Sequence, residues 1–142
     1  MEIARQGRLA AALTVTVALA PTAHATPVNG VQATVLSKHH VGETDYIVAE
    51  ITMSPGGSTG WHTHRGEVYG LVKAGVLTHY GADCARDGVF GPGTPITDPT
   101  GAEHVHLGRN EGTTPVVLEV TYLDPAGAPT SDSAPDPGCG FG

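Results

Sequence analysis

Two short histidine pairs constrain this chain more than any other feature of its sequence. The first is His62-Thr63-His64, and the second is His104-Val105-His106, about forty residues later. Both lie in sequence that reads as β-strand, where side chains alternate between two faces, so both histidines of a pair point to one side. Two imidazoles on one face, with a third from another strand, present three nitrogens to a divalent metal and leave coordination positions open. This layout is typical of a working metal site rather than a closed structural one.

The rest of the sequence predicts an all-β fold. Aromatic residues make up 5% of the chain, which has 20 glycines and 11 prolines, a composition typical of short strands joined by tight turns. Turn signals separate six strand-like runs, which predicts a sandwich or a closed barrel. The runs are Val31–Lys38, Tyr46–Met53, Val68–Lys73, Val76–Tyr80, His104–Arg109 and Val116–Leu123. We expect Ala74-Gly75, between two apolar runs, to form a hairpin turn.

The first 25 residues have the three parts of a secretory signal peptide. Arg5 and Arg8 give a positive start, Leu9–Ala20 is an apolar run too short for a comfortable membrane span, and Ala23-His24-Ala25 supplies small residues for cleavage. We therefore expect a secreted or periplasmic protein that begins at Thr26.

The 117 residues that remain are enough for one domain with one core. We expect a β domain over residues 26–125 and a Pro/Gly-rich tail over residues 126–142 that has no core of its own. The formal charge is −7 at pH 7, and about −8 without the signal peptide. An acidic chain without a basic patch is a poor partner for nucleic acid or for an anionic membrane.

Cys84 and Cys139 are the two cysteines of the chain. In an exported protein such a pair predicts a disulfide, which here would tie the tail to a mid-chain loop. Two free thiols or a cysteine metal ligand are disfavoured, because neither cysteine has a CxxC-type neighbour.

The spacing around both histidine pairs is similar to the two cupin motifs. The first motif, G-x5-H-x-H-x3-4-E-x6-G, is matched by Gly56, His62, His64 and Gly75. The second, G-x5-P-x-G-x2-H-x3-N, is matched in its first half by Gly93, Pro99, Gly101 and His104, and in its second half by His106 and Asn110. The chain thus resembles a small single-domain secreted cupin, over about Val31 to Leu123. The resemblance implies a double-stranded β-helix (jelly-roll) barrel with a divalent metal in its mouth.

Two departures from the cupin motifs affect the ligand set. The family's glutamate would fall at Val68, whereas Glu67 is one place early, and a one-residue shift turns a side chain to the opposite face. We therefore favour a site without Glu67, although a bulge at Gly66 would re-aim it inward. The second motif offers two histidines, and we favour His106 over His104 because it lies inside the strand. A four-histidine site using both remains an alternative.

The remaining histidines are assigned to other roles. We expect His39 and His40 at a solvent-exposed turn and His79 on an outer strand as a packing or surface residue. Asn110 is a candidate for orienting a ligand histidine or capping a turn.

Three neutral imidazoles suit Fe, Zn, Ni or Cu, and the residue types do not distinguish these metals or Mn. The sequence therefore predicts a metal-dependent enzyme, of oxygenase or isomerase type, acting on a small oxygenated molecule. The alternative is a non-catalytic cupin that binds a small ligand, a sugar or the metal itself. Cupin barrels often dimerise, so the resemblance leaves a homodimer open.

The cleavage site gives a direct test of export. Expressed with its own leader in a secreting host, the chain should be recovered from the extracytoplasmic fraction with an intact mass that begins at Thr26. Recovery of the full-length chain from the cytoplasm alone would contradict the signal-peptide prediction.

Overall fold

The computed structural model describes residues 29–141, so the predicted signal peptide lies outside the described residues. These residues form ten strands in two five-stranded antiparallel sheets and contain no helix. The all-β prediction is confirmed. Among the described residues, no helix is long and apolar enough to cross a membrane.

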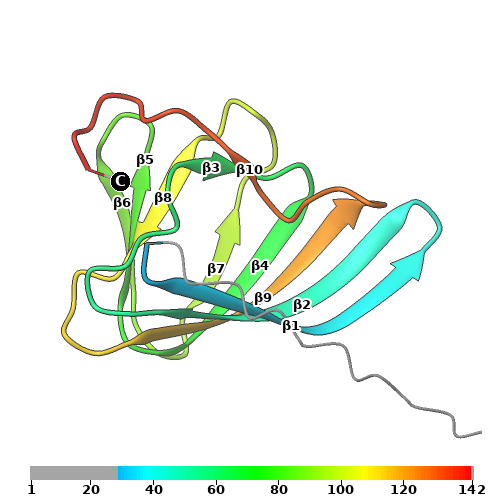
Figure 1. The fold of residues 1–142 in the computed structure, drawn as a ribbon, viewed down its shortest axis with the longest axis horizontal. Coiled ribbons are helices and arrows are strands. Elements are labelled where there is room, and N and C mark those ends of the chain that lie inside the picture. The colour runs from blue at the N-terminus through cyan, green and yellow to red at the C-terminus, as the bar shows by residue number, and fades with distance from the viewer. Residues whose placement is uncertain (1–28, 142) are drawn as a thin grey trace, which may run out of the picture.

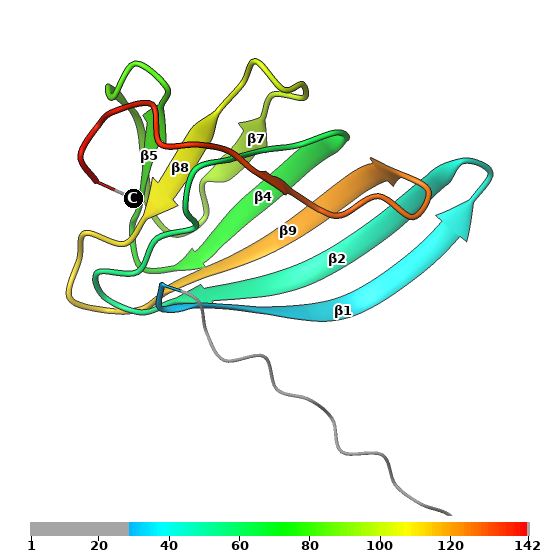
Figure 2. The same ribbon diagram turned by 45° about the horizontal axis from the view of Figure 1, so that its top comes forward.

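The two sheets have the following strand orders. The first contains β1 (Val31–Val41), β2 (Thr44–Met53), β9 (Val116–Pro125), β4 (Glu67–Ala74) and β7 (Pro95–Asp98). The second contains β10 (Asp132–Ser133), β3 (His62–Thr63), β8 (His106–Arg109), β5 (Leu77–Gly81) and β6 (Arg86–Phe90). Figures 1 and 2 show the long strands β1, β2 and β9 side by side, with the shorter strands β5 and β8 at one end of the molecule.

The core lies between the two sheets and follows the alternation of side chains along the strands. In β9 every second residue from Val116 to Asp124 is buried, while the residues between them are half-buried. Met53, Val72 and Val116 of this core have no exposed surface. Burying such side chains contributes about 1.5–3 kcal/mol each, so this interior stabilises the arrangement that carries the histidines.

The hairpin predicted at Ala74-Gly75 is wrong. β4 pairs with β7 and β9 in the first sheet, whereas β5 pairs with β6 and β8 in the second. The chain therefore crosses between sheets here. Gly75 has a φ of 71°, and a Cβ at this position would collide with the carbonyl oxygen of Pro115. The turn residues were read correctly as a reversal, but local sequence does not say which strand becomes the partner.

Three edge strands, β6, β7 and the two-residue β10, were not predicted from the sequence. β6 is mostly exposed and therefore has no alternating apolar pattern. β7 begins with Pro95, which reads as a breaker but is tolerated at the start of an edge strand. His39 and His40 are exposed as expected, but they lie in β1 rather than in a turn.

The tail beyond β9 packs back across the barrel. Its short strand β10 pairs with β3, setting Ser133 opposite His62, and Figure 2 shows this segment crossing the molecule toward the end that holds β5. Trp61, which is 6% exposed, donates a hydrogen bond from Nε1 to the carbonyl oxygen of Phe141 at 3.1 Å. A disulfide joins Cys84 to Cys139 across 55 positions of sequence.

We expect loss of this disulfide to destabilise the fold. Closing so long a loop restricts the unfolded chain and contributes about 2–4 kcal/mol. The Cys84→Ser/Cys139→Ser variant should therefore show a lower midpoint in urea unfolding, and reduced wild-type protein should match it. Equal midpoints for the oxidised wild type and the double variant would contradict the stabilising role.

Candidate metal centre

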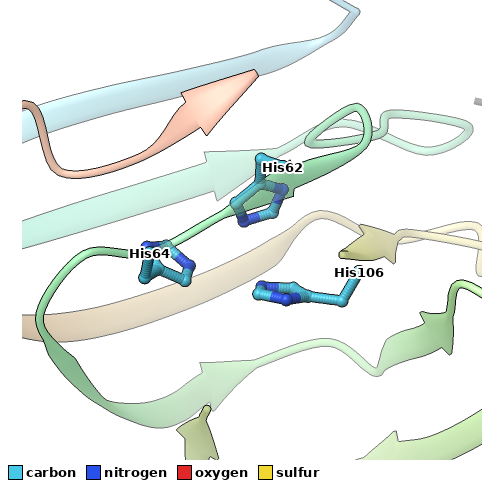
Figure 3. Close-up of side chains that lie close together, drawn as sticks. All are labelled: His62, His64 and His106. Carbon is cyan, nitrogen blue, oxygen red and sulfur yellow. The ribbon is translucent and has the colours of Figure 1, made fainter. Parts of the chain in front are cut away.

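His62, His64 and His106 converge from two neighbouring strands. β3 and β8 are antiparallel, with His62 directly opposite His106. His64 follows β3, two residues after His62, which places both on one side. One possible ligand atom from each of the three lies within 4.8 Å of the others, and Figure 3 shows the three rings gathered around a common space.

Backbone carbonyl groups fix the orientation of all three rings. The Nδ1 atoms of His62, His64 and His106 lie 2.8, 2.7 and 2.9 Å from the carbonyl oxygens of Gly60, Thr130 and His104, respectively. A carbonyl oxygen only accepts, so each Nδ1 carries a proton and donates it. In the neutral ring the lone pair is then on Nε2, the nitrogen used to bind a metal.

The donor set fits a divalent metal ion. The Nε2 atoms of His64 and His106 are buried and have no hydrogen-bond partner within the described part of the chain. A buried acceptor without a partner costs free energy, and a cation shared by the rings would satisfy it. The carbonyl behind each ring is the outer contact that metal-binding histidines commonly have.

The lowered pKa values of His62 and His106 keep both rings in the neutral form that binds a metal. Burial, together with the neighbouring His106, lowers the pKa of His62 from 6.5 to about 4. Burial also lowers the pKa of His106. Neutral imidazole is the form that ligates, so near pH 7 no proton has to be displaced from these two rings.

The structure separates the two histidines of the second motif. The side chain of His104 is 45% exposed and its Nε2 lies 3.5 Å from Glu103, whereas that of His106 is 5% exposed. His104 contributes to the cluster through its backbone carbonyl oxygen, which accepts a hydrogen bond from Nδ1 of His106, and not through its ring. The strands thus bring His106, and not His104, to His62 and His64.

Glu67 lies outside the cluster. Its side chain is exposed and accepts a hydrogen bond from the Tyr69 hydroxyl at 2.8 Å. Val68, the next residue, is 4% exposed and faces the interior. Gly66 does not re-aim Glu67. A Cβ at Gly66 would collide with the carbonyl oxygen of Leu123, so glycine serves close packing here.

Asn110 ties a loop together rather than orienting a ligand histidine. Its side chain is 1% exposed, and Nδ2 donates to the carbonyl oxygens of Met53 and Thr114. Its Oδ1 accepts from the backbone of Gly112. Of the two roles expected for Asn110, the structure places it in turn capping.

Two further residues near the cluster were not identified from the sequence. Asp98, at the end of β7, places Oδ2 3.8 Å from the Nε2 atoms of both His64 and His106. His79, on β5, is 13% exposed and its Nε2 lies 3.5 Å from Oδ1 of Asp98.

The alternation of buried and exposed positions along β5 and β7 indicates that His79 and Asp98 face the interior. Leu77 and Ile96 are buried and lie two positions before His79 and Asp98, respectively, so each pair shares a face. The sequence did not identify the two residues because β7 was not predicted and because His79 was expected on an outer strand as a packing or surface residue.

A small cavity of about 60 Å³ adjoins the histidines. Its apolar lining includes Ile51, Leu118 and Val120, and its polar lining includes the three histidines and Asp98. Burial raises the pKa of Tyr122, whose ring lies 6.0 Å from that of His64. The cavity has room for an ion and a very small ligand.

Comparisons with known proteins identify the fold. No protein-family model and no curated protein matches the chain. Among solved structures, an uncharacterized conserved protein with a double-stranded beta-helix domain from Klebsiella pneumoniae matches with a TM-score of 0.61 and 21% identity, over 78% of this chain and 85% of that chain. A cupin domain from Bordetella pertussis matches with a TM-score of 0.55 and 24% identity, over 70% of this chain and 98% of that one.

A third match is a recombinant oxalate oxidase in complex with glycolate. It has a TM-score of 0.54 and 21% identity, over 71% of this chain and 54% of that one. Two antiparallel sheets, with the histidine cluster between them, form the β-barrel of this chain. In particular, the chain has the cupin double-stranded β-helix fold, as the motif spacing predicted.

The low pKa of His62 predicts acid sensitivity of the metal-free protein. Between pH 6.5 and 4 the unfolded chain takes up a proton at His62, whereas the folded state does not. The free energy of unfolding is therefore highest above pH 6.5 and falls as the pH falls toward 4, by roughly 3 kcal/mol for His62.

Urea unfolding of chelator-treated protein at several pH values across this interval measures the effect. His62→Gln should lose less stability over the same interval than wild type, because it removes this proton uptake and leaves the other titrating groups in place. Parallel pH profiles for the two proteins would contradict the assignment to His62.

Proposed function

We propose that this protein is a metal-dependent enzyme, of oxygenase or isomerase type, that acts on a small oxygenated molecule. His62, His64 and His106 are its proposed metal ligands. The observation that carries the proposal is the fixed tautomer of the three rings, because each Nδ1 donates to a backbone carbonyl. Each ring therefore offers a lone pair on Nε2, and one possible ligand atom from each ring lies within 4.8 Å of the others.

Each part of the site has a separate role in this proposal. A metal bound by histidines polarises an oxygen atom of a bound substrate or activates a bound water. The chain's own residues hold the rings in the neutral form and keep them at fixed angles. Ile51, Leu118 and Val120 give the cavity an apolar wall beside the histidines.

The cavity volume indicates the size of the substrate. About 60 Å³ is far below the 300–1,000 Å³ or so of a typical drug-sized ligand pocket. The oxalate oxidase with the same fold was solved with glycolate, a two-carbon hydroxy acid. We therefore infer that small hydroxy acids and dicarboxylic acids are the substrate class to test first.

We also propose that the protein works outside the cytoplasm. The Cys84–Cys139 disulfide supports this, because stable disulfides belong to oxidising compartments. The predicted signal peptide agrees with the same location.

Metal content after gentle purification tests the proposed site. Wild type should bind about one divalent ion per chain, whereas His62→Ala/His64→Ala should lose the ion together with turnover of a small acid or uptake of O₂. The matched control is His39→Ala/His40→Ala, which removes two exposed histidines from β1 and should bind metal like wild type.

A second pair of variants tests the ligand assignment in the second motif. His106→Ala should lose the metal, while His104→Ala should retain it. Metal binding that survives the His62/His64 substitutions would overturn the site. Metal binding with ligand-induced thermal shifts but no turnover would instead identify a non-catalytic binding protein.

A further inference from the structure

Asp98 enters the barrel beside the position at which the resemblance placed a glutamate. β7 and β4 pair antiparallel with Asp98 directly opposite Val68. Residues opposite each other in such a pair have side chains on the same face. Val68 is 4% exposed and lines the cavity, so Asp98 points to the same interior, where it also lines the cavity. The carboxylate comes from the neighbouring strand rather than from β4.

The atoms that face one another here are all acceptors. Oδ2 of Asp98 lies 3.8 Å from Nε2 of His64 and 3.8 Å from Nε2 of His106. Both rings donate Nδ1–H to backbone carbonyls, so in the neutral ring each Nε2 presents a lone pair toward the carboxylate. The negative Asp98 carboxylate and the two Nε2 lone pairs repel one another unless a positive charge lies between them.

A metal ion satisfies this arrangement better than a proton does. A proton bridges one pair of acceptors, whereas a cation is shared by several donors at about 2.0–2.2 Å each. Adjacent ligands of such an ion are separated by about 3.0–3.5 Å, so the observed 3.8 Å from Asp98 to His64 and to His106 requires only a small contraction. Within 4.8 Å, Asp98 groups with His79 and His106 rather than with His62, so Asp98 and His62 must also move closer together to share one ion. The other carboxylate oxygen, Oδ1, faces His79 at 3.5 Å, and His79 in turn contacts Asp87 through Nδ1 at 2.6 Å. Because Oδ1 of Asp98 faces His79, its other oxygen, Oδ2, is the one that faces His64 and His106.

We propose that Asp98 is a fourth, carboxylate ligand of the metal held by His62, His64 and His106. It replaces the carboxylate that the cupin motif would provide from the position of Val68. The inference rests on the proposed function, because it requires the three-histidine metal site.

Titration of the chelator-treated protein with Co²⁺ tests this inference, with visible absorption as a readout of the ligand set. Asp98→Asn should weaken Co²⁺ binding by roughly 10- to 100-fold and change the absorption spectrum. Asp98→Glu keeps the carboxylate and should bind within about fivefold of wild type. Glu67→Gln, the matched control, removes an exposed carboxylate next to Val68 and should leave affinity and spectrum unchanged.

The outcomes separate the two proposals. Wild-type affinity and an unchanged spectrum in Asp98→Asn would show that Asp98 is not a ligand, while the three-histidine site would stand. Failure of the wild type to bind Co²⁺ would overturn the metal site and this inference together. If metal-free Asp98→Asn is not folded, as shown by the lack of a cooperative unfolding transition, Asp98→Glu is used for the test instead. In that variant, loss of Co²⁺ binding from a folded protein would overturn the inference.

Discussion

Alternation of side chains along paired antiparallel strands is the constraint on which both the core and the candidate site depend. In β9 it turns every second residue from Val116 to Asp124 into the interior. In the pair formed by β3 and β8 it sets His62 opposite His106 on the inner face. A register slip of one residue would expose the apolar side chains and separate the histidines. The burial that stabilises the barrel therefore also holds the site together.

Backbone groups complete the site. The carbonyl oxygens that fix the histidine rings belong to Gly60, Thr130 and His104, three segments far apart in the sequence. Thr130 lies in the tail, which β10 and the Cys84–Cys139 disulfide hold against the barrel. The tail therefore contributes to the orientation of His64, although it has no core of its own. Stability of the tail and geometry of the site are physically connected.

Much of the fold followed from short-range patterns, and the errors came from long-range choices. The longer strands were recognised because one face of each is buried, which leaves alternation in the sequence. β6 was missed because it is an exposed edge, and β7 because Pro95 and Asp98 read as turn residues. Gly75 was recognised as a reversal, but its sequence did not tell a hairpin from a crossover between sheets. β4 instead pairs with β7 and β9, both of which come later in the chain than β5.

The sequence by itself determined the two histidine pairs, the facing of Val68 against Glu67, and the all-β class, because these depend on residue spacing and on a period of two. Only the tertiary structure decided that His106 rather than His104 joins His62 and His64, since both have the same parity. It also brought Asp98 and His79 to the same cavity. Their approach depends on how β5 and β7 lie in two different sheets, and strand spacing along the chain does not encode that distance.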